Sequence, residues 1–313
     1  MKLSVVIPTY NEQDNVPLLH TRLTAVMDKL EISEYEFIFV NDGSRDHTFA
    51  RIVELSVTDP HVKYIDFSRN FGHQIAVTAG LDVAEGEAVV IIDADLQDPP
   101  EVIESLYEKY QEGYEVVYAR RRKRKGESWF KKVTAKWFYR ILARITSIDI
   151  PIDTGDFRLI DQKVVKVLRQ MPEQNKYLRG QIAWIGFRQT DVLYDRHSRH
   201  TGETGYSIGK MLRFALDGIT AFSDLPLRVA TLSGFFVSGI SFLLMIYALL
   251  SRFVWQKYVV GWTSIILCVL FIGGIQLICL GIIGEYINRI SVNVRQRPLY
   301  VIRKSKLDTT SKK

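Results

Sequence analysis

The chain has 313 residues, 47% hydrophobic and 24% charged, with a formal net charge of +6 at pH 7. This length accommodates one large folded domain with further elements, and the positive charge favours an anionic partner such as a phosphorylated substrate or lipid headgroups. The sequence shows no aromatic and basic pattern of a nucleic-acid platform, and both cysteines lie in an apolar run, so neither nucleic-acid binding nor a disulfide is predicted.

Short apolar runs alternate with helical segments over the first third of the chain. The apolar runs predict strands, and the segments with apolar residues every three to four positions predict helices. The strands are expected at 3–7, 36–40, 62–66 and 89–92, and the helices at 15–31, 46–57 and 73–84. This alternation is typical of right-handed βαβ units, so the sequence predicts an α/β fold with a mostly parallel, Rossmann-like sheet.

Each predicted strand ends in polar side chains, and parallel strands bring such ends together at one edge, where open α/β sheets bind ligands. The ends are Asn11-Glu12, Asp42, Ser68-Arg69-Asn70, and Asp93 with Asp95. Polar loops are common in any protein, but several acidic and amide side chains at one edge favour a nucleotide site. The sequence lacks the glycine-rich signatures of dinucleotide-binding proteins and P-loop NTPases.

The fourth strand ends in the stretch Asp93-Ala94-Asp95-Leu96-Gln97. Asp93 and Asp95 are two residues apart, so both project to the same side of an extended chain. Two carboxylates and the amide oxygen of Gln97 are ligands that Mg²⁺ and Mn²⁺ prefer, with positions left for phosphate oxygens. An isolated Asp-x-Asp is more often an acidic turn, and here the neighbouring polar strand ends favour the metal site.

The middle of the chain is rich in basic residues. A strand at 116–118 precedes the basic run 120–125, in which one or two arginines are expected to bind a diphosphate. The loop 196–206 also attracts phosphate, and its two histidines lack a third ligand for zinc. Around these segments the pattern predicts an amphipathic helix at 129–145, a strand within 153–159, helices at 163–170 and 177–185, and a strand at 188–194.

The last third of the chain contains two stretches without charge, 229–251 and 258–284, each long enough to cross a membrane. The short link between them predicts a helical hairpin, and Lys and Arg outside it predict both termini in the cytoplasm. The amphipathic segment 208–222 is expected at the membrane surface, with an ordinary surface helix as the alternative. The predicted regions are a cytoplasmic domain at 1–206, an interfacial helix at 207–226, the hairpin at 227–286 and a basic cytoplasmic tail at 287–313, disordered from Ser305 onward.

Four motifs resemble those of family-two inverting glycosyltransferases. They are Pro8-Thr9-Tyr10-Asn11-Glu12, Asn41-Asp42-Gly43-Ser44, Ser68-Arg69-Asn70-Phe71-Gly72 and Asp93-Ala94-Asp95-Leu96-Gln97-Asp98-Pro99-Pro100. More narrowly, residues 2–300 resemble the polyprenyl-phosphate glycosyltransferases, relatives of dolichol-phosphate mannose synthase, in the bacterial branch with two C-terminal transmembrane helices. The resemblance implies a GT-A type domain and a Mg²⁺ or Mn²⁺ ion.

The implied reaction moves one sugar from a nucleoside diphosphate sugar to a polyprenyl phosphate such as undecaprenyl phosphate. The product would be a lipid-linked sugar for modification of cell-envelope glycans. UDP-glucose is the expected donor, and UDP-N-acetylglucosamine and GDP-mannose are the alternatives. The Gln-x-x-Arg-Trp signature of processive synthases is not found in the sequence, which favours single transfers.

The resemblance also implies roles for individual residues. Asp95 and Asp156 would be catalytic, and Arg199 would contact the acceptor phosphate. In the loop 202–206 relatives usually read Gly-Glu-Ser-Lys-Tyr, so Gly205 stands here in place of a phosphate-contacting lysine. Nucleotide-sugar binding is assigned to Pro8, Tyr10, Glu12, Asp42, Asp93, Arg121 and Arg124, and metal binding to Asp93, Asp95 and Gln97.

Two other classes of function remain as alternatives. A membrane sensor would bind nucleotide sugars without turnover, whereas a channel or flippase would need more polar residues in the spans than Gln276. The spans also contain glycines that would allow close helix packing in a homo-oligomer. These glycines are Gly234, Gly239, Gly273 and Gly274.

Overall fold

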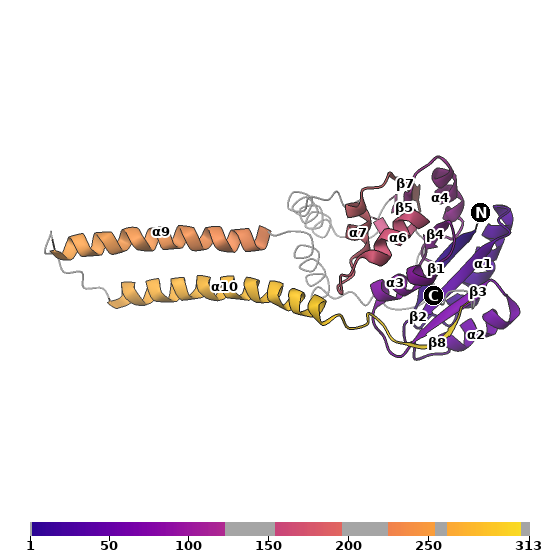
Figure 1. Ribbon diagram of the computed structural model, residues 1–313, viewed down its shortest axis with the longest axis horizontal. Coiled ribbons are helices and arrows are strands. Elements are labelled where there is room, and N and C mark those ends of the chain that lie inside the picture. The colour runs from indigo at the N-terminus through magenta and orange to yellow at the C-terminus, as the bar shows by residue number, and fades with distance from the viewer. Residues whose placement is uncertain (1, 123–153, 196–224, 254–261, 308–313) are drawn as a thin grey trace. The chain divides into compact units, whose positions relative to one another are not determined.

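The computed structural model describes residues 2–122, 154–195, 225–253 and 262–307 (Figure 1). The predicted helix at 129–145, the loop 196–206 and the interfacial helix at 208–222 lie outside the described residues. The chain forms two compact units. One comprises Met1–Ala143, Ile148–Ser207 and Arg297–Lys313, and the other Arg144–Ser147 and Ile208–Gln296.

The first unit contains an eight-stranded sheet in the order β7-β5-β6-β4-β1-β2-β3-β8. Strands β1 to β4 are parallel, β5 pairs with β7 in parallel, and β6 and β8 run against their neighbours. The predicted α/β fold with a mostly parallel sheet is therefore confirmed. The strands are β1 (Leu3–Thr9), β2 (Tyr35–Asn41), β3 (Val62–Phe67), β4 (Ala88–Ile91), β5 (Val116–Arg121), β6 (Thr154–Asp161), β7 (Gln189–Tyr194) and β8 (Ile302–Lys306).

Helices cover both faces of this sheet, and β1 shows why its sequence is mostly apolar. Leu3, Val5 and Ile7 belong to one buried cluster, together with side chains of α1, α2 and α4. Val6 points the other way, into a second cluster with side chains of α3, α6 and α7. A strand buried on both faces is therefore nearly continuous in apolar residues, and the buried Ser4 is hydrogen-bonded to Glu36. The helices are α1 (Asn15–Lys29), α2 (Thr48–Thr58), α3 (His73–Val83), α4 (Val102–Gln111), α6 (Gln162–Gln170) and α7 (Leu178–Ile185).

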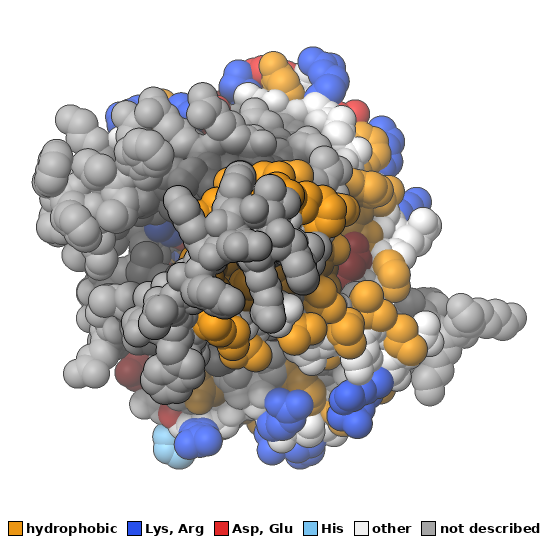
Figure 2. All heavy atoms as spheres, turned by 90° about the vertical axis from the view of Figure 1, so that its left-hand side faces the viewer, with side chains coloured by type: hydrophobic (Ala, Val, Ile, Leu, Met, Phe, Trp, Pro, Cys, Tyr) orange, Lys and Arg blue, Asp and Glu red, His pale blue; other side chains and the backbone are white. Residues whose placement is uncertain are grey.

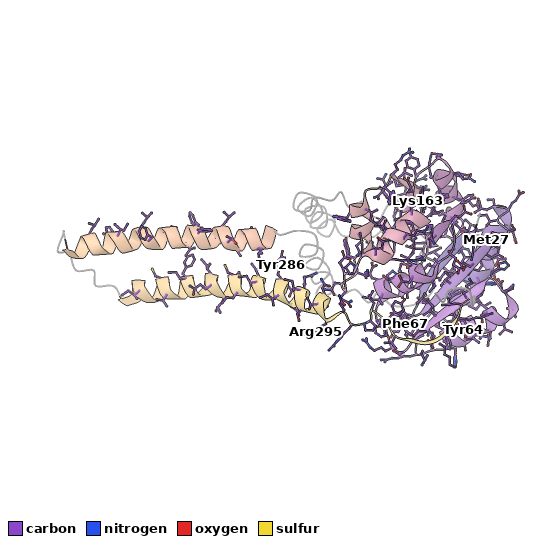
Figure 3. All side chains as sticks on the ribbon, viewed as in Figure 1. Met27, Tyr64, Phe67, Lys163, Tyr286 and Arg295 are labelled. Atoms are coloured by element: carbon purple, nitrogen blue, oxygen red, sulfur yellow. The ribbon has the colours of Figure 1, made fainter. Side chains whose placement is uncertain are left out.

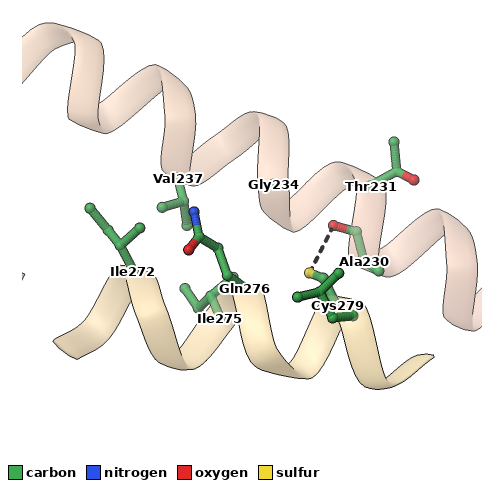
Figure 4. A pocket seen from close by; sticks show the side chains of 9 residues that line it. Ala230, Thr231, Gly234, Val237, Ile272, Ile275, Gln276 and Cys279 are labelled. Carbon is green, nitrogen blue, oxygen red and sulfur yellow. Dashed lines mark hydrogen bonds between the residues drawn. The ribbon is translucent and has the colours of Figure 1, made fainter. Parts of the chain in front are cut away.

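The second unit contains two long helices, α9 (Leu225–Phe253) and α10 (Trp262–Arg295), which lie side by side (Figure 1). Among the described residues one stretch, Phe271–Arg295, has the length and hydropathy to cross a membrane, and none of it is buried. Large hydrophobic side chains such as Phe235 are exposed along these helices, and hydrophobic side chains are prominent in Figure 2. A pocket of about 680 Å³ lies between α9 and α10, with Gln276 in its wall (Figure 4).

The C-terminal tail differs from the prediction that the chain is disordered from Ser305. Ser305 and Lys306 belong to β8, which pairs antiparallel with Ile65 and Tyr64 of β3. The segment Ile302–Lys306 is exposed and mostly polar, without the apolar alternation that predicts a strand. It is an edge strand, and its lysines are typical of edges that do not pair further.

Candidate active site

The loops that follow β1, β2 and β3 are joined by hydrogen bonds at one edge of the sheet. Both carboxylate oxygens of Asp42, at the end of β2, accept backbone N–H bonds, from Phe71 at 2.6 Å and Gly72 at 3.0 Å. Asp42 is only 3% exposed. Burial raises the pKa of this carboxyl, although the two N–H groups oppose the change. Asp42 therefore fixes the loop after β3 against the loop after β2.

The loop after β1 is held in the same way. The backbone N–H of Asn11 donates to Ser44 Oγ at 3.0 Å, and its side-chain oxygen accepts from the N–H of Arg45 at 2.9 Å. Glu12 donates its N–H to Thr48 Oγ1 at 2.8 Å. Pro8 is buried within β1, while Tyr10 is 42% exposed. Tyr10 therefore offers an exposed aromatic ring on which a nucleotide base could stack.

Gly43 lies where the loops after β2 and β3 meet. Its φ is +66°, and a Cβ at this position would stand 2.4 Å from the carbonyl carbon of Arg69. We expect Gly43→Ala to lower the free energy of unfolding by about 3 kcal/mol, from backbone strain and overpacking together. Gly113→Ala is the control, because its φ is +92° but the nearest atom is 3.6 Å away. Chemical denaturation of both variants measures the difference, and equal losses would contradict the close approach.

The metal-binding stretch predicted after β4 forms a tight acidic loop. Leu96 has a φ of +56°, and Asp95 Oδ1 accepts the N–H of Gln97 at 3.1 Å. Asp93 Oδ1 is buried and accepts no hydrogen bond from the described residues. Burial raises the pKa of Asp93 to about 6, and the charges of neighbouring carboxylates contribute further. The loop therefore concentrates negative charge that a bound cation would offset.

Asp93→Asn is expected to stabilise the metal-free chain at neutral pH. The carboxyl ionises near pH 3.8 in the unfolded chain and near 6 in the folded chain, so wild-type stability falls as the pH rises through this interval. The variant escapes a penalty of about 3 kcal/mol above pH 6. Thermal unfolding in detergent with chelator should give a difference that is largest at pH 8 and vanishes near pH 4. Asp14→Asn, at an exposed position, should show no such trend.

Asp156, on β6, is a buried carboxylate at the centre of a cluster of charges. Its Oδ1 accepts from Arg179 Nε at 2.8 Å, and its Oδ2 lies 3.0 Å from both His73 Nε2 and Gln74 Nε2. Burial opposes ionisation, but Arg179 and His73 outweigh it and hold the pKa of Asp156 well below its ordinary value. Asp156 is therefore a permanent carboxylate near neutral pH, unsuited to accept a proton.

His73 joins this cluster to the acidic loop. Its Nε2 lies 3.6 Å from Asp93 Oδ1 as well as 3.0 Å from Asp156 Oδ2. Burial works against the imidazolium, but Asp93 and Asp156 outweigh it and raise the pKa of His73 to about 9. The sequence patterns do not predict His73, Gln74 or Arg179 as site residues. The position of His73 directly after the Ser68–Gly72 motif was the available signal.

Arg121, predicted as a diphosphate ligand, is anchored by two residues of the fold. Its Nε donates to the hydroxyl of Tyr194 at 3.2 Å, and its Nη2 lies 3.8 Å from Asp98 Oδ2. The hydroxyl of Tyr194 in turn donates to the buried Asp98. These contacts fix the guanidinium beside the loop after β4, with its charge partly balanced by Asp98. Arg124 and Arg199 lie outside the described residues.

Known proteins resemble this chain in sequence. Residues 4–169, more than half of the chain, match the family model described as Glycosyl transferase family 2. The chain belongs to this family. The glycosyltransferase is 52% identical to the uncharacterized glycosyltransferase YkcC of Bacillus subtilis, over 97% of this chain and 94% of that one. The predicted family and the predicted glycosyltransferase activity are confirmed.

Two further likenesses concern named activities. The glycosyltransferase is 43% identical to the SfII prophage-derived bactoprenol glucosyl transferase of Shigella flexneri, over 97% of this chain and 98% of that one. It also resembles glucosyl-3-phosphoglycerate synthase from Mycobacterium tuberculosis in complex with Mn²⁺, UDP-glucose and phosphoglyceric acid, with 19% identity and a TM-score of 0.48. That likeness covers 70% of this chain and 79% of the other.

Proposed function

We propose that this glycosyltransferase moves glucose from UDP-glucose to a polyprenyl phosphate and so makes a lipid-linked glucose. The observation that carries the proposal is the 43% identity, over nearly the whole of both chains, to a bactoprenol glucosyl transferase. The acidic loop, the buried carboxylate of Asp156 and the long apolar helix α10 each suit this reaction. Glucose is preferred over N-acetylglucosamine and mannose because of that relative.

The donor would bind along the edge formed by the loops after β1, β2 and β4. Tyr10 and the loops that Asp42 joins would hold the nucleoside, with Glu12 and Pro8 shaping the loop. Arg121 would contact the diphosphate, and we assign the same task to Arg124. An arginine fork already fixed by Asp98 and Tyr194 would meet phosphate oxygens at little entropic cost.

A divalent cation, Mg²⁺ or Mn²⁺, would bind at Asp93, Asp95 and Gln97. The buried oxygen of Asp93 and the negative charge of the loop fit such an ion. The described residues contain no group of three acidic, histidine or cysteine side chains placed to hold a metal by themselves. This fits an ion that takes much of its coordination from the donor diphosphate. When bound, the ion would offset the charge of the leaving diphosphate.

The acceptor chemistry requires little from a base. A phosphate monoester is ionised near neutral pH, so its oxygen can form the new bond to the anomeric carbon without losing a proton first. The bond from that carbon to the diphosphate breaks, and UDP leaves from the opposite face with inversion. Asp156, held ionised by Arg179 and His73, would stabilise positive charge at the anomeric centre or orient the acceptor. Arg199 would bind the acceptor phosphate.

The acceptor is a membrane lipid, which gives the C-terminal unit its role. We propose that α9 and α10 form a transmembrane hairpin, preceded by an interfacial helix at 207–226, with the catalytic domain 1–206 and both termini in the cytoplasm. The support is the unburied apolar stretch Phe271–Arg295 and the absence of charge from 229–251 in the sequence. Such anchoring would keep the lipid phosphate within reach of the donor. The glycines of the hairpin would allow a homo-oligomer.

The test uses the purified full-length chain in detergent or lipid. It is incubated with undecaprenyl phosphate and, separately, labelled UDP-glucose, UDP-N-acetylglucosamine and GDP-mannose, with Mg²⁺ or Mn²⁺. We expect label in the organic phase from UDP-glucose. Preferential transfer from another donor would change the assigned sugar. Nucleotide-sugar binding without product from any donor would support a sensor and overturn the proposal.

A further inference from the structure

The segment Tyr300–Lys306, here called the C-terminal segment, is built into the sheet beside the proposed donor site. Its strand β8 pairs with β3, with Ile302 opposite Phe67 and Lys306 opposite Tyr64. Figure 3 labels Tyr64 and Phe67 on β3, and the N–H of Ser68 adds a bond to the carbonyl of Val301 at 3.0 Å. The C-terminal segment thus pairs with the free edge of β3. The loop after β3 is the one that Asp42 fixes through Phe71 and Gly72.

A chain of polar contacts runs from this segment to two donor loops. Arg303 binds the carboxylate of Asp66 with two N–H groups, Nε at 2.7 Å and Nη2 at 3.1 Å. Asp66 Oδ1 also accepts from Asn41 Nδ2 at 2.8 Å. The other end of the Asn41 amide accepts the N–H of Ser44 at 3.4 Å, and Ser44 Oγ accepts the N–H of Asn11. Every link lies within the first unit.

The stability of this series of polar contacts depends on Arg303. Asp66 is 0% exposed, so its carboxylate cannot exchange its protein partners for water while the fold is intact. Removing one partner of a buried charge leaves the other uncompensated, and the structure then shifts to relieve it. The same carboxylate accepts a hydrogen bond from the side chain of Asn41 and so fixes its orientation. Asn41 directly precedes Asp42 in the sequence.

A second series of contacts, between aromatic rings, also joins the C-terminal segment to the loop after β3. The ring of Tyr300 stacks on Phe67, with centroids 5.1 Å apart, and its hydroxyl donates to Asp82 at 2.9 Å. Phe67 packs edge-on against Phe71 at 5.5 Å. The N–H of Phe71 is one of the two that Asp42 accepts. The C-terminal segment therefore supports both sides of the Asp42 contact.

We propose that Arg303 and Tyr300 are positioning residues for the donor, and that the C-terminal segment is part of the nucleotide-sugar site. This inference rests on the proposed function, because it assigns the loops at Asn41–Ser44 and Phe71–Gly72 to donor binding. Neither residue contacts the donor itself. They act by holding Asn41, Asp42 and Phe71 in one arrangement, so their loss should weaken donor binding without changing acceptor binding.

The test compares Arg303→Met with Lys304→Met in the full-length chain. Lys304 lies on the same strand, is exposed and carries the same charge. Arg303→Met should raise the donor KM about tenfold, with acceptor KM and kcat within about twofold, as expected for a charged hydrogen bond. Lys304→Met should match the wild type. Arg303→Lys, which keeps one charged contact, should recover part of the donor affinity.

Hydrogen exchange without substrate provides a second readout. Arg303→Met should speed exchange of the amides of Ser44, Phe71 and Gly72 about tenfold relative to Lys304→Met, with β1 unchanged. Equal exchange in the two variants, or faster exchange with unchanged donor KM, would overturn the inference. If the wild type transferred no sugar from any donor, UDP binding by calorimetry would replace the donor KM. The proposed function would then have failed, and the positioning role would be decided by these two measurements.

Discussion

Asp95→Asn is expected to reduce sugar transfer by more than about a hundredfold while leaving the chain folded and membrane-bound. The side chain is nearly buried, and its Oδ1 accepts the N–H of Gln97, which shapes the loop. Asparagine keeps the size and one acceptor oxygen, so the loop should survive. The loss of one negative charge should weaken binding of the divalent cation and of the donor diphosphate together.

Three measurements check this expectation. Transfer is measured at saturating UDP-glucose, Mn²⁺ affinity by calorimetry, and folding by the melting temperature. Asp28→Asn, an exposed position on α1, is the matched control and should resemble the wild type in all three. Higher Mn²⁺ should restore part of the lost activity. Undiminished transfer by Asp95→Asn would show that the metal and diphosphate bind elsewhere.

Local sequence patterns were sufficient to predict the strands and their parallel direction up to β4. After β4 they did not predict the direction of β6 or the existence of β8. Mostly apolar strands such as Leu3–Thr9 are buried on both faces, so their own composition predicts them. The antiparallel direction of β6 depends on the strands it joins, β4 and β5, and not on its own composition. The pairing of β8 with β3 joins residues from opposite ends of the chain, and its exposed polar sequence gives no periodic signal.

The residues of the candidate site also fall into those that local sequence predicts and those that it does not. Asp93, Asp95 and Gln97 were found because they follow one strand within five positions, as one loop. Arg179 and His73 lie on different helices, α7 and α3, and meet at Asp156 only through packing on β6. The sequence resemblance singled out Asp156 but gave no sign of its partners. Those partners hold its carboxyl in the ionised form, which favours an electrostatic role over that of a base.

Asp156→Asn is expected to lower kcat by about a hundred- to a thousandfold, with a smaller change in the donor KM, because it removes charge stabilisation at the reacting centre. The variant keeps the shape of the side chain but leaves Arg179 and His73 without their shared counter-charge. Asp161→Asn is the control on the same strand. Asp161 accepts the N–H of Lys163 at the start of α6 with Oδ1 and the hydroxyl of Tyr110 with Oδ2. Asparagine can keep the first bond through its oxygen, and its amide N–H can donate to the hydroxyl oxygen of Tyr110.

The pH dependence separates the two roles open to Asp156. The pKa of its carboxyl lies well below its ordinary value, so it stays ionised from pH 5 to 9 and should contribute no limb to the wild-type rate profile. Asp156→Asn should therefore lower the rate by the same factor at every pH in this range. A general base would instead give a variant whose deficit shrinks at low pH, and this change in the deficit is the diagnostic, because Asp93 titrates near pH 6 and can lower the wild-type rate on acidification by itself. That second pattern would support proton removal by Asp156, whereas a constant deficit would support the proposed electrostatic role.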